Sequence, residues 1–507
     1  MKTCIYRVKH LVASMAPAML IAGISMAPLA QTGPRPDFVL QGIVRGSQNH
    51  TYVKVPFRVP AGVHRVTVTF AYTEKDKHTA LDLGLLDPSG LRCWSGGNKS
   101  VLTVGLSDAT PSCLPGAIPA GTWNVLIGVP NIRAQVTSHY TAQVFLTRTG
   151  LVTDYPEILR EPLRAGPGWF RGDLHMHTAH SDGQCPSQTG KMVPCPVYFT
   201  VEAAARRGLD FIAITDHNAT SHYDSMRELQ PYFDKVLLIP GREITTFQGH
   251  MNLLGTTDFL DFRLGSPGVP TINDLLRNAQ KMGALISINH PRAPSGEMCM
   301  GCGWTPSATA DMSLFNAVEA VNGGSETPAQ SGIPFWEGQL AAGHRPTAIG
   351  GSDNHRPMTS FDKPGSMGSP TTVVYAANLS TPTILAGIRS GRVFIDLTGS
   401  RDRMLELSAR CNGESAQMGG TLKAAKGAEV SFEAQASGVA GGKIQLIEDG
   451  KPMPKVGDSV GQEADEKIQD PWTSDGGRHW FLAQVLGPDG KLWLLGNPIY
   501  VNWPELH

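Results

Sequence analysis

The chain has 507 residues, of which 41% are hydrophobic, and this is enough for two or three domains with cores of their own. Its 43 Lys and Arg residues balance 44 Asp and Glu residues, so the formal net charge is -1. No basic run follows the first ten residues. This excludes the clustered cationic surface that proteins use to bind duplex DNA or RNA, and we expect no nucleic-acid partner.

Residues 1–30 have the pattern of a secretory signal peptide. A positively charged start is followed by the apolar stretch "LVASMAPAMLIAGISMA", which Pro17 interrupts and which is short for a membrane span. We predict cleavage after Ala30, export to the periplasm and no membrane span in the mature chain. An uncleaved membrane anchor is the alternative.

The cysteine spacing suits an oxidising compartment. Of the eight cysteines, Cys4 leaves with the predicted signal peptide, and three pairs are close in sequence. These pairs suggest the local disulfides Cys93–Cys113, Cys185–Cys195 and Cys299–Cys302, with Cys411 left over. The sequence leaves the connectivity open. The "CMGC" segment also fits a redox site or half a zinc site, but no second CxxC completes a zinc knuckle.

Apolar and polar residues alternate from about residue 38 to residue 148, as in "YVKVPFRV" and "RVTVTFAY". Turn residues separate these stretches, so we predict a β-sandwich over residues 33–150. Residues 151–168 are rich in Pro and Gly and read as a linker.

Short apolar runs alternate with helical stretches in residues 169–400. "FIAITDH" and "GALISINHP" are typical of buried strands, whereas "VYFTVEAAARRGL" and "TINDLLRNAQKMG" are typical of helices. This βα alternation predicts a mostly parallel sheet or a barrel. Strand-like alternation returns in residues 401–507, where we predict a small β domain.

Polar residues of the middle region follow the apolar core of each predicted strand. His175 and His177 flank Met176, and residues two apart in a strand share a face at roughly 6–7 Å. Asp353 and His355 repeat this spacing. A single histidine at a strand end is usually structural, so each position by itself is weak evidence for a ligand.

The whole set is stronger evidence for a metal site than any one of its members, because histidines and carboxylates recur at the same end of successive predicted βα units. The set is His175, His177, Asp182, His217, Glu243, His250, His290, Asp353 and His355. Carboxylates and imidazoles at this density need a cation. We therefore predict a multinuclear metal site, and its oxygen and nitrogen ligands suit zinc, manganese or iron. The chain has no HExxH, P-loop or dinucleotide-binding motif.

Five motifs, "DLHMHTAHSDG", "ITDH", "GREIT" with "GHMNLLG", "NHP" and "GSDNH", occur in this order. Together they resemble the polymerase and histidinol phosphatase (PHP) superfamily over roughly residues 170–400. The similarity is greatest to its exported branch, related to carbaryl hydrolase, and to bacterial phosphodiesterases. The resemblance implies a distorted (β/α)7 barrel with two or three divalent transition-metal ions at its mouth. The expected fold is therefore multi-domain α/β, with this barrel between the β-sandwich and the small β domain.

The resemblance also implies how the ligands divide. It implies a first site of His175, His177, Glu243 and Asp353, a second of bridging Glu243, His250 and His290, and a third of Asp182, His217 and His355. Asp182 stands where other members use histidine.

We expect the function to be hydrolysis of phosphoesters of small molecules. Two nearby cations lower the pKa of a shared water enough to hold hydroxide at neutral pH, and a third neutralises charge on the phosphoryl oxygens. Basic residues are sparse near the motifs, which favours a phosphodiester or small organophosphate over a dianionic monoester. Glu243 and Asp353 are the expected catalytic ligands, and His222 is a candidate acid for the leaving group. The expected substrate contacts are Arg292, Glu319 and Asn322.

Two alternatives remain open. Carboxyl- or carbamate-ester hydrolysis would use the same centre with an apolar pocket, for which Trp304, Phe335 and Trp336 are candidates. A non-catalytic metal-binding protein would keep the ligands without turnover. The metal, the natural substrate and the oligomeric state do not follow from the sequence.

Overall fold

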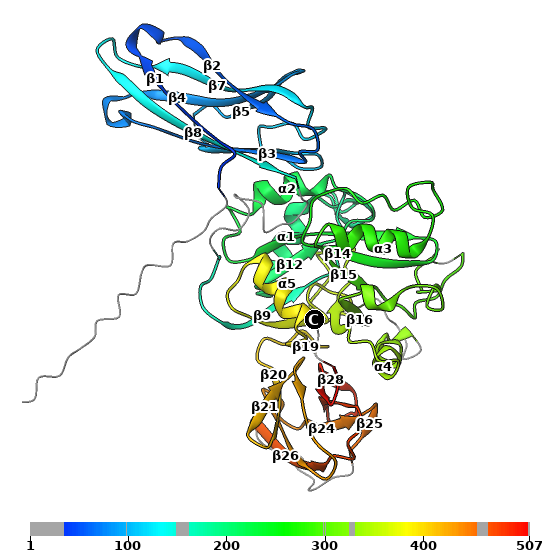
Figure 1. Cartoon of the computed structure of the whole chain (residues 1–507). Helices are drawn as coiled ribbons and strands as arrows, with labels where there is room; N and C mark the ends of the chain where they lie inside the picture. The colour runs from blue at the N-terminus through cyan, green and yellow to red at the C-terminus, as the bar shows by residue number, and fades with distance from the viewer. Residues whose placement is uncertain are drawn as a thin grey trace, which may run out of the picture. The chain divides into compact units, whose positions relative to one another are not determined.

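The computed structural model describes residues 35–97, 99–148, 162–297, 299, 301–323, 330–453 and 465–504 (Figure 1). The predicted signal peptide and most of the predicted linker lie outside these residues. Within the described ranges, no helix has both the length and the apolar character required to cross a membrane.

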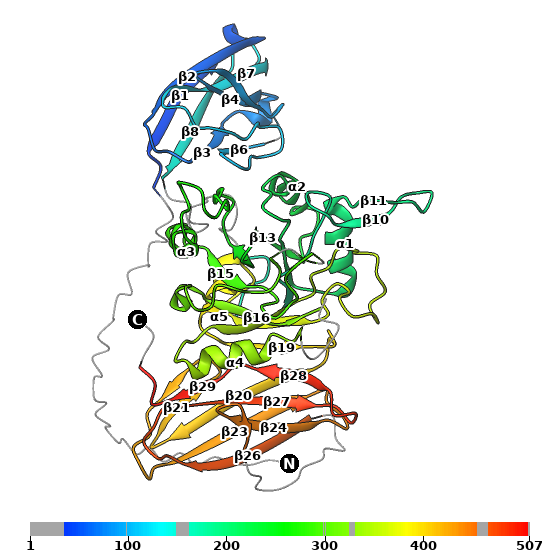
Figure 2. The same ribbon diagram turned by 90° about the vertical axis from the view of Figure 1, so that its right-hand side faces the viewer.

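The N-terminal region is formed by two four-stranded sheets. Its strands are β1 (Phe38–Arg45), β2 (Thr51–Val59), β3 (Arg65–Tyr72), β4 (Ala80–Asp87), β5 (Gly90–Trp94), β6 (Val101–Gly105), β7 (Gly121–Asn131) and β8 (Thr137–Thr147). One sheet has the order β1-β8-β3-β6 and the other β2-β7-β4-β5 (Figure 2). Val66 and Val68 of the first sheet share one core with Val125 and Ile127 of the second. The period-2 alternation of each strand therefore buries one face of each sheet.

The middle region combines strands with the five α-helices found in the described residues. Its elements are β9 (Gly168–Asp173), β10 (Gln184–Pro186), β11 (Met192–Pro194), α1 (Val197–Arg207), β12 (Phe211–Ile214), α2 (His222–Leu229), β13 (Leu237–Thr246), β14 (Gly249–Leu254), α3 (Ile272–Lys281), β15 (Leu285–Ile288), β16 (Ala317–Asn322), α4 (Ile333–Ala341), β17 (Thr347–Gly351), β18 (Thr371–Ala376), α5 (Thr381–Arg389) and β19 (Val393–Asp396). In Figure 1, α1, α2, α3 and α5 surround the strands of this region.

The prediction of a (β/α)7 barrel is wrong. The structure is mostly β, with 43% strand and 13% helix, and the strands of the described residues form several sheets and no barrel. The main sheet runs in the order β17-β16-β15-β14-β13-β12-β9-β18-β19-β28-β27-β24-β25. A parallel barrel needs a crossover helix after every strand, but β13 and β14 form an antiparallel hairpin, and β14 is antiparallel to β15. β18 is also antiparallel to β9 and β19.

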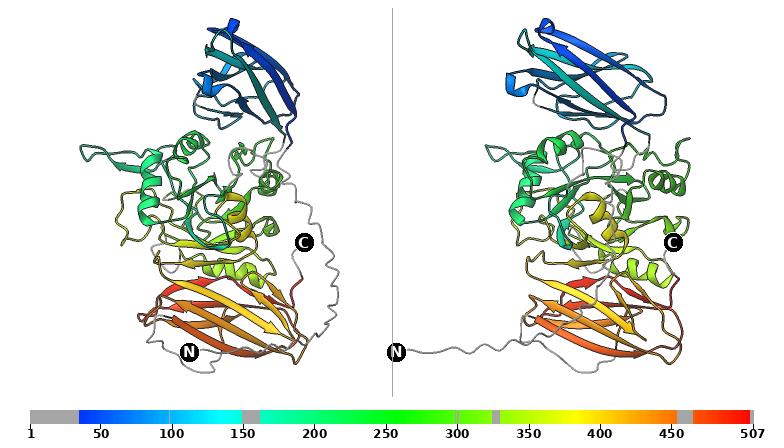
Figure 3. Two further views of the ribbon diagram at one scale, coloured as in Figure 1. Left: turned by 90° about the vertical axis from the view of Figure 1, so that its left-hand side faces the viewer. Right: turned by 60° about the vertical axis from the view of Figure 1, so that its left-hand side comes forward.

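The C-terminal region continues the main sheet and adds another. Its strands are β20 (Met404–Cys411), β21 (Glu414–Gln417), β22 (Thr421–Leu422), β23 (Glu429–Ser437), β24 (Lys443–Glu448), β25 (Lys451–Pro452), β26 (Asp465–Thr473), β27 (His479–Leu486), β28 (Leu492–Gly496) and β29 (Ile499–Val501). β28 pairs with β19 of the middle region, and β21-β20-β23-β26 is a separate sheet. Figure 3 shows the strands of this region as two layers. Phe432 of β23 and Phe481 of β27 meet in the core between them, with ring centroids 4.3 Å apart.

The three predicted cysteine pairs are confirmed. The structure joins Cys93 to Cys113, Cys185 to Cys195 and Cys299 to Cys302, and it leaves Cys411 as a buried free thiol. Disulfides are compatible with an exported protein.

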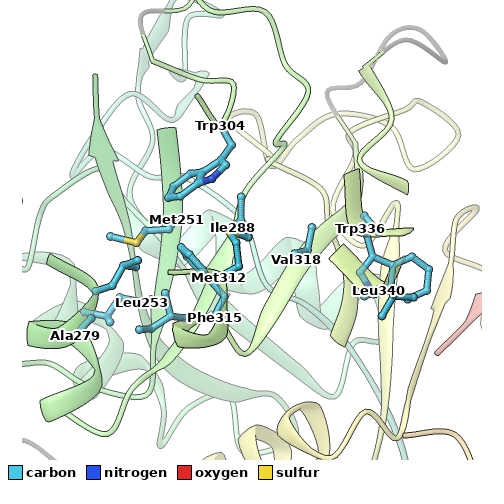
Figure 4. Packing of buried hydrophobic residues seen from close by; sticks show 14 of the residues in the cluster. Met251, Leu253, Ala279, Ile288, Trp304, Met312, Phe315, Val318, Trp336 and Leu340 are labelled. Carbon is cyan, nitrogen blue, oxygen red and sulfur yellow. The ribbon is translucent and has the colours of Figure 1, made fainter. Parts of the chain in front are cut away.

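A large hydrophobic core lies behind strands β14, β15 and β16 (Figure 4). Met251, Leu253, Ile288 and Val318 of these strands pack there with residues of α3 and α4. Because successive side chains of a strand point to opposite faces, the intervening residues face away from this core. Glu319 is one of them. The packing of the core thus determines which side chains face the opposite side of the sheet.

Replacement of Leu340 by alanine tests this packing. Leu340 of α4 is fully buried in the core, so Leu340→Ala should lower the free energy of unfolding by about 2–5 kcal/mol. Its neighbour Gln339 is only partly buried, and Gln339→Ala should change stability by at most about 0.5 kcal/mol. Urea unfolding followed by circular dichroism measures both. Equal effects of the two substitutions would contradict the assigned orientation of α4.

Candidate metal centre

The structure brings all nine predicted ligands together. His175 and His177 follow β9, His217 follows β12, and His290 follows β15. Glu243 and His250 belong to the β13–β14 hairpin, Asp353 and His355 follow β17, and Asp182 lies in the loop after His177. Isolated β-bridges join Met176 to Asn354 and His217 to Glu243, so the polar segments that follow separate strands lie side by side.

Glu243 is the carboxylate around which the histidines gather. Its Oε1 lies 3.4 Å from His175 Nε2, 3.2 Å from His250 Nδ1 and 3.2 Å from His290 Nε2. Burial opposes ionisation of this carboxyl, but the charge of His175 overcomes it and holds the pKa of Glu243 well below its ordinary value. Glu243 is therefore an anion in the interior.

The second oxygen of Glu243 faces a different pair of histidines. Its Oε2 lies 2.8 Å from His217 Nδ1 and 3.6 Å from His177 Nε2. The two oxygens thus face separate sets of imidazoles, which is the arrangement expected of a bridging carboxylate.

Asp353 provides a second carboxylate at the same place. Its Oδ1 lies 3.1 Å from His177 Nε2 and 3.4 Å from His175 Nε2. Burial opposes the ionisation of Asp353, but the charge of His175 holds its pKa well below the ordinary value. His175 and His177 therefore point at both Glu243 and Asp353.

The third predicted group is the solvent-exposed side of the centre. Asp182 Oδ1 lies 3.3 Å from His355 Nε2 and 3.8 Å from both His217 Nε2 and His177 Nδ1. The side chains of Asp182 and His355 are 56% and 36% exposed, whereas that of His177 is fully buried. The centre is therefore exposed to solvent on this side.

The residues present fit bound cations. The candidate ligands form four overlapping groups, and within each group the ligand atoms lie within 4.8 Å of one another. Together these groups comprise the nine residues. In the described structure, the buried atoms His175 Nε2, Glu243 Oε2 and both ring nitrogens of His250 have no hydrogen-bond partner. Buried polar atoms are normally paired, so close contacts without hydrogen-bond geometry indicate ligands that converge on an ion. These buried groups can hold metal ions.

Two of the nine residues have unusual backbone conformations. His290 has φ +24° and Asp353 has φ +53°. Residues other than glycine rarely adopt this left-handed backbone conformation, which costs about 1–3 kcal/mol for each residue. Such conformations persist where the surrounding structure fixes them, and here both belong to residues aimed at Glu243 or its neighbours.

Glu319 positions several ligands from behind. Its Oε1 lies 3.0 Å from His175 Nδ1, and its Oε2 accepts hydrogen bonds from the backbone N–H of His290 at 2.8 Å and from Asn322 at 3.0 Å. Asn322 also lies 3.4 Å from Asp353 Oδ2. A proton on His175 Nδ1 leaves Nε2 free to face Glu243, so Glu319 selects the tautomer that a metal ligand needs.

Asp173 and Asp216, neither of which was predicted from the sequence, support the centre in a similar way. Asp173 accepts hydrogen bonds from the backbone N–H groups of Ser352 at 3.0 Å and Gly368 at 2.8 Å, which fixes the segment before Asp353. Asp216 accepts from Thr178 and Ser181 and fixes the loop that carries Asp182. Their position directly before the histidine motifs, in "DLH" and "TDH", was the available signal.

Glu319 and Asn322, predicted as substrate contacts, are buried, with exposed fractions of 2% and 6%. Arg292 is exposed, and its Nη1 lies 3.5 Å from the carbonyl oxygen of Ser331. The contacts of Glu319 and Asn322 with ligand residues are those of positioning residues, and the assignment of substrate contacts, including Arg292, stays a prediction.

His222, predicted as an acid for the leaving group, is fully buried at the start of α2. Its Nε2 donates a hydrogen bond to the carbonyl of Gly241 at 2.9 Å, and its Nδ1 lies 3.6 Å from Asp216. Burial lowers the pKa of His222 to about 4, although the charge of Asp216 opposes this shift. A neutral, enclosed imidazole does not protonate a leaving group at neutral pH.

Comparison with known proteins gives no family for this chain. No protein-family model matches it, and no curated protein is significantly similar to it. The function is therefore inferred from the centre and the motifs.

Glu319→Gln should weaken metal binding about 10–100-fold, because loss of the carboxylate releases the orientation of His175 and His290. Competition against a chromogenic chelator measures the affinity. Glu337→Gln is the matched control, since Glu337 is a part-buried carboxylate of α4 outside the centre. An affinity equal to that of the unmodified protein would contradict the positioning role.

The burial of His222 predicts that the free energy of unfolding decreases in acid. Its pKa in the folded protein, about 4, lies below the ordinary value of 6.5. As the pH falls from 6.5 towards 4, the unfolded chain gains a proton that the folded protein excludes. Stability from this residue is complete above pH 6.5 and declines below it, by at most about 1.4 kcal/mol per pH unit.

The midpoint of urea unfolding at pH 7 and pH 5 measures this decline. His222→Gln keeps a donor for Gly241 without the titration and should reduce the difference between the two pH values. His50→Gln, at an exposed position, should leave the difference unchanged. If His222→Gln behaves like His50→Gln, burial of a neutral His222 is refuted.

Proposed function

We propose that the protein is a metal-dependent hydrolase of phosphoesters, acting on phosphodiesters or small organophosphates of the periplasm. The observation that carries this proposal is Glu243, whose two oxygens face separate sets of histidines. The resemblance of the five motifs to the PHP superfamily supports the same reaction type. The proposal makes no use of the barrel that this resemblance implied.

The residues divide between two or three divalent ions. Following the resemblance, His175, His177 and Asp353 with Glu243 would hold the first ion, and His250 and His290 with Glu243 would hold the second. Glu243 Oε1 faces members of both sets, since it lies 3.4 Å from His175 and 3.2 Å from each of His250 and His290. Asp182, His217 and His355 would hold the third, and their ligand atoms form one group with His177. The set contains imidazole and carboxylate but no thiolate, which suits manganese, zinc or iron.

The chemistry of such a centre is well defined. When bound, divalent ions held by a shared carboxylate lower the pKa of water and polarise the oxygens of an ester. Glu243 and Asp353 contribute buried negative charge, since both carboxyls have pKa values well below their ordinary range. Glu319 holds His175 in one orientation. The exposed Asp182 and His355 leave that side open to the substrate.

The charge around the centre supports a diester as substrate. In the described part of the chain, no Lys or Arg forms an ion pair with Glu243, Asp353 or Asp182. Arg242, next to Glu243 in sequence, instead donates to the carbonyl of Asp258. Enzymes that bind dianionic monoesters usually hold them with such cations, so a singly charged phosphodiester fits better.

We rank carbamate- and carboxyl-ester hydrolysis second. Trp336 is fully buried and Trp304 is 6% exposed, both within the core behind the sheet, and Phe335 packs against the same core. These side chains do not supply the apolar pocket that an aryl carbamate needs. A non-catalytic metal-binding role predicts ions without turnover, and the assay below separates it from the hydrolase.

The purified chain, loaded in turn with manganese, zinc and iron, should hydrolyse bis(p-nitrophenyl) phosphate faster than p-nitrophenyl phosphate or an aryl carbamate. Glu243→Gln should lower the diester rate by about 100-fold or more, because a misplaced centre loses both activated water and substrate orientation. Release of p-nitrophenol and metal analysis of the same samples provide the measurement.

Glu228→Gln, on α2 and away from the centre, is the control and should retain full activity. A faster monoester reaction would overturn the diesterase assignment. A metal-loaded chain with no turnover of any of the three esters would favour the non-catalytic role.

A further inference from the structure

A second charged cleft lies away from the metal centre. It has a volume of about 780 Å³ and is lined by the end of α5, by residues just before β17 and β19, and by the turn from β21 to β22. β17 begins at Thr347 near this cleft, and its other end leads to Asp353 of the metal centre. The cleft and the centre are thus separated by the length of a five-residue strand, about 16 Å.

Three arginines line this cleft, namely Arg345, Arg389 and Arg392. The other lining residues are neutral, and no carboxylate of the described chain forms an ion pair with any of the three. The three guanidinium groups therefore give the cleft a positive charge. A multivalent anion in the cleft would neutralise this charge and accept hydrogen bonds from their N–H groups.

Aromatic rings hold two of these guanidinium groups in place. Arg345 lies over Tyr500 at 4.5 Å and over Trp503 at 5.1 Å from the ring centroids. Arg392 lies over Tyr375 at 4.4 Å. Stacking uses the face of a guanidinium and leaves its edge free to donate. The side chains are therefore ordered before a ligand arrives, which reduces the entropy lost on binding.

Two glycines allow the backbone to form the floor of the cleft. A Cβ at Gly419 would lie 1.8 Å from the carbonyl oxygen of Ser390, and one at Gly391 would lie 2.8 Å from the Cα of Gly419. Both residues also have positive φ. Only glycine permits this approach of the β21–β22 turn to the end of α5, and the approach places Arg389 and Arg392 beside the turn.

We propose that this cleft is a binding site for a multivalent oxyanion, a phosphate group or a phosphate-bearing small molecule, distinct from the metal centre. Phosphate offers several acceptor oxygens to the planar donor forks of arginine. Arg345 donates to Thr421 Oγ1 and to the carbonyl of Pro504, and Arg389 donates to the carbonyl of Gly283. A guanidinium carries five N–H donors, so both side chains retain further N–H groups. This inference is independent of the proposed hydrolase activity.

Inorganic phosphate is the probe, and the full chain is first freed of metal, because phosphate also binds metal ions. Calorimetric titration at low ionic strength should show saturable binding, which weakens as salt is added. Arg389→Gln combined with Arg392→Gln should weaken binding about tenfold or more. Arg392→Lys, which keeps the charge and loses the planar fork, should have a smaller effect.

Arg410→Gln is the matched control, because Arg410 is an exposed arginine of β20 outside the cleft. It should bind phosphate as the unmodified chain does. Arg389→Gln by itself removes only one exposed side chain, and it is tested as well in case the double variant does not fold. An unchanged melting temperature confirms that the single variant is folded. Absence of saturable phosphate binding to the metal-free chain, or equal binding by the double variant, would overturn the proposal. Binding that requires metal and is lost in Glu243→Gln would assign phosphate to the metal centre instead.

Discussion

The arrangement of the centre depends on one interaction, the contact of the buried Glu243 carboxylate with imidazoles from separate strands. An ionised carboxylate in the interior is unfavourable unless positive charge surrounds it. Here His175, His217 and His290, from three different strand ends, approach it within 3.4 Å. The strands that carry these residues are fixed by hydrogen bonds along the main sheet. The position of one carboxylate therefore constrains the registers of several strands.

Strand alternation connects this centre to the hydrophobic core. In β16, Val318 and Ala320 pack into the core, and Glu319 between them faces the ligands. In β14, Met251 and Leu253 pack in the same way, while His250 lies against Glu243. A shift of one residue in either strand would exchange the two faces and bury the charged side chains in the core. Hydrophobic packing thus provides the rigidity that the ligands lack by themselves.

The sequence predicts the members of the centre better than it predicts the fold. Histidines and carboxylates at successive strand ends mark the ligands because their spacing reflects the local period of a strand. The topology depends on pairing between strands, which the period does not encode. The hairpin from Leu237 to Leu254 and the pairing of β19 with β28 both give apolar runs like those of βα units. Roles such as that of Glu319 depend on which carboxylate is buried, and a single sequence does not show this.

The local charge of the centre matters more for the proposed reaction than the net charge of the whole chain. Glu243, Asp353, Asp182 and Glu319 place four carboxyl groups at the centre, and the described lysines and arginines form no ion pair with the first three. Without cations this region would repel an anionic ester. Two or three divalent ions would reverse the sign of its charge, so in the proposed reaction metal occupancy would control both the attraction of the substrate and the chemistry. A formal net charge of -1 conceals this reversal. For this reason the counts of charged residues say little about how the centre would recognise a small anion.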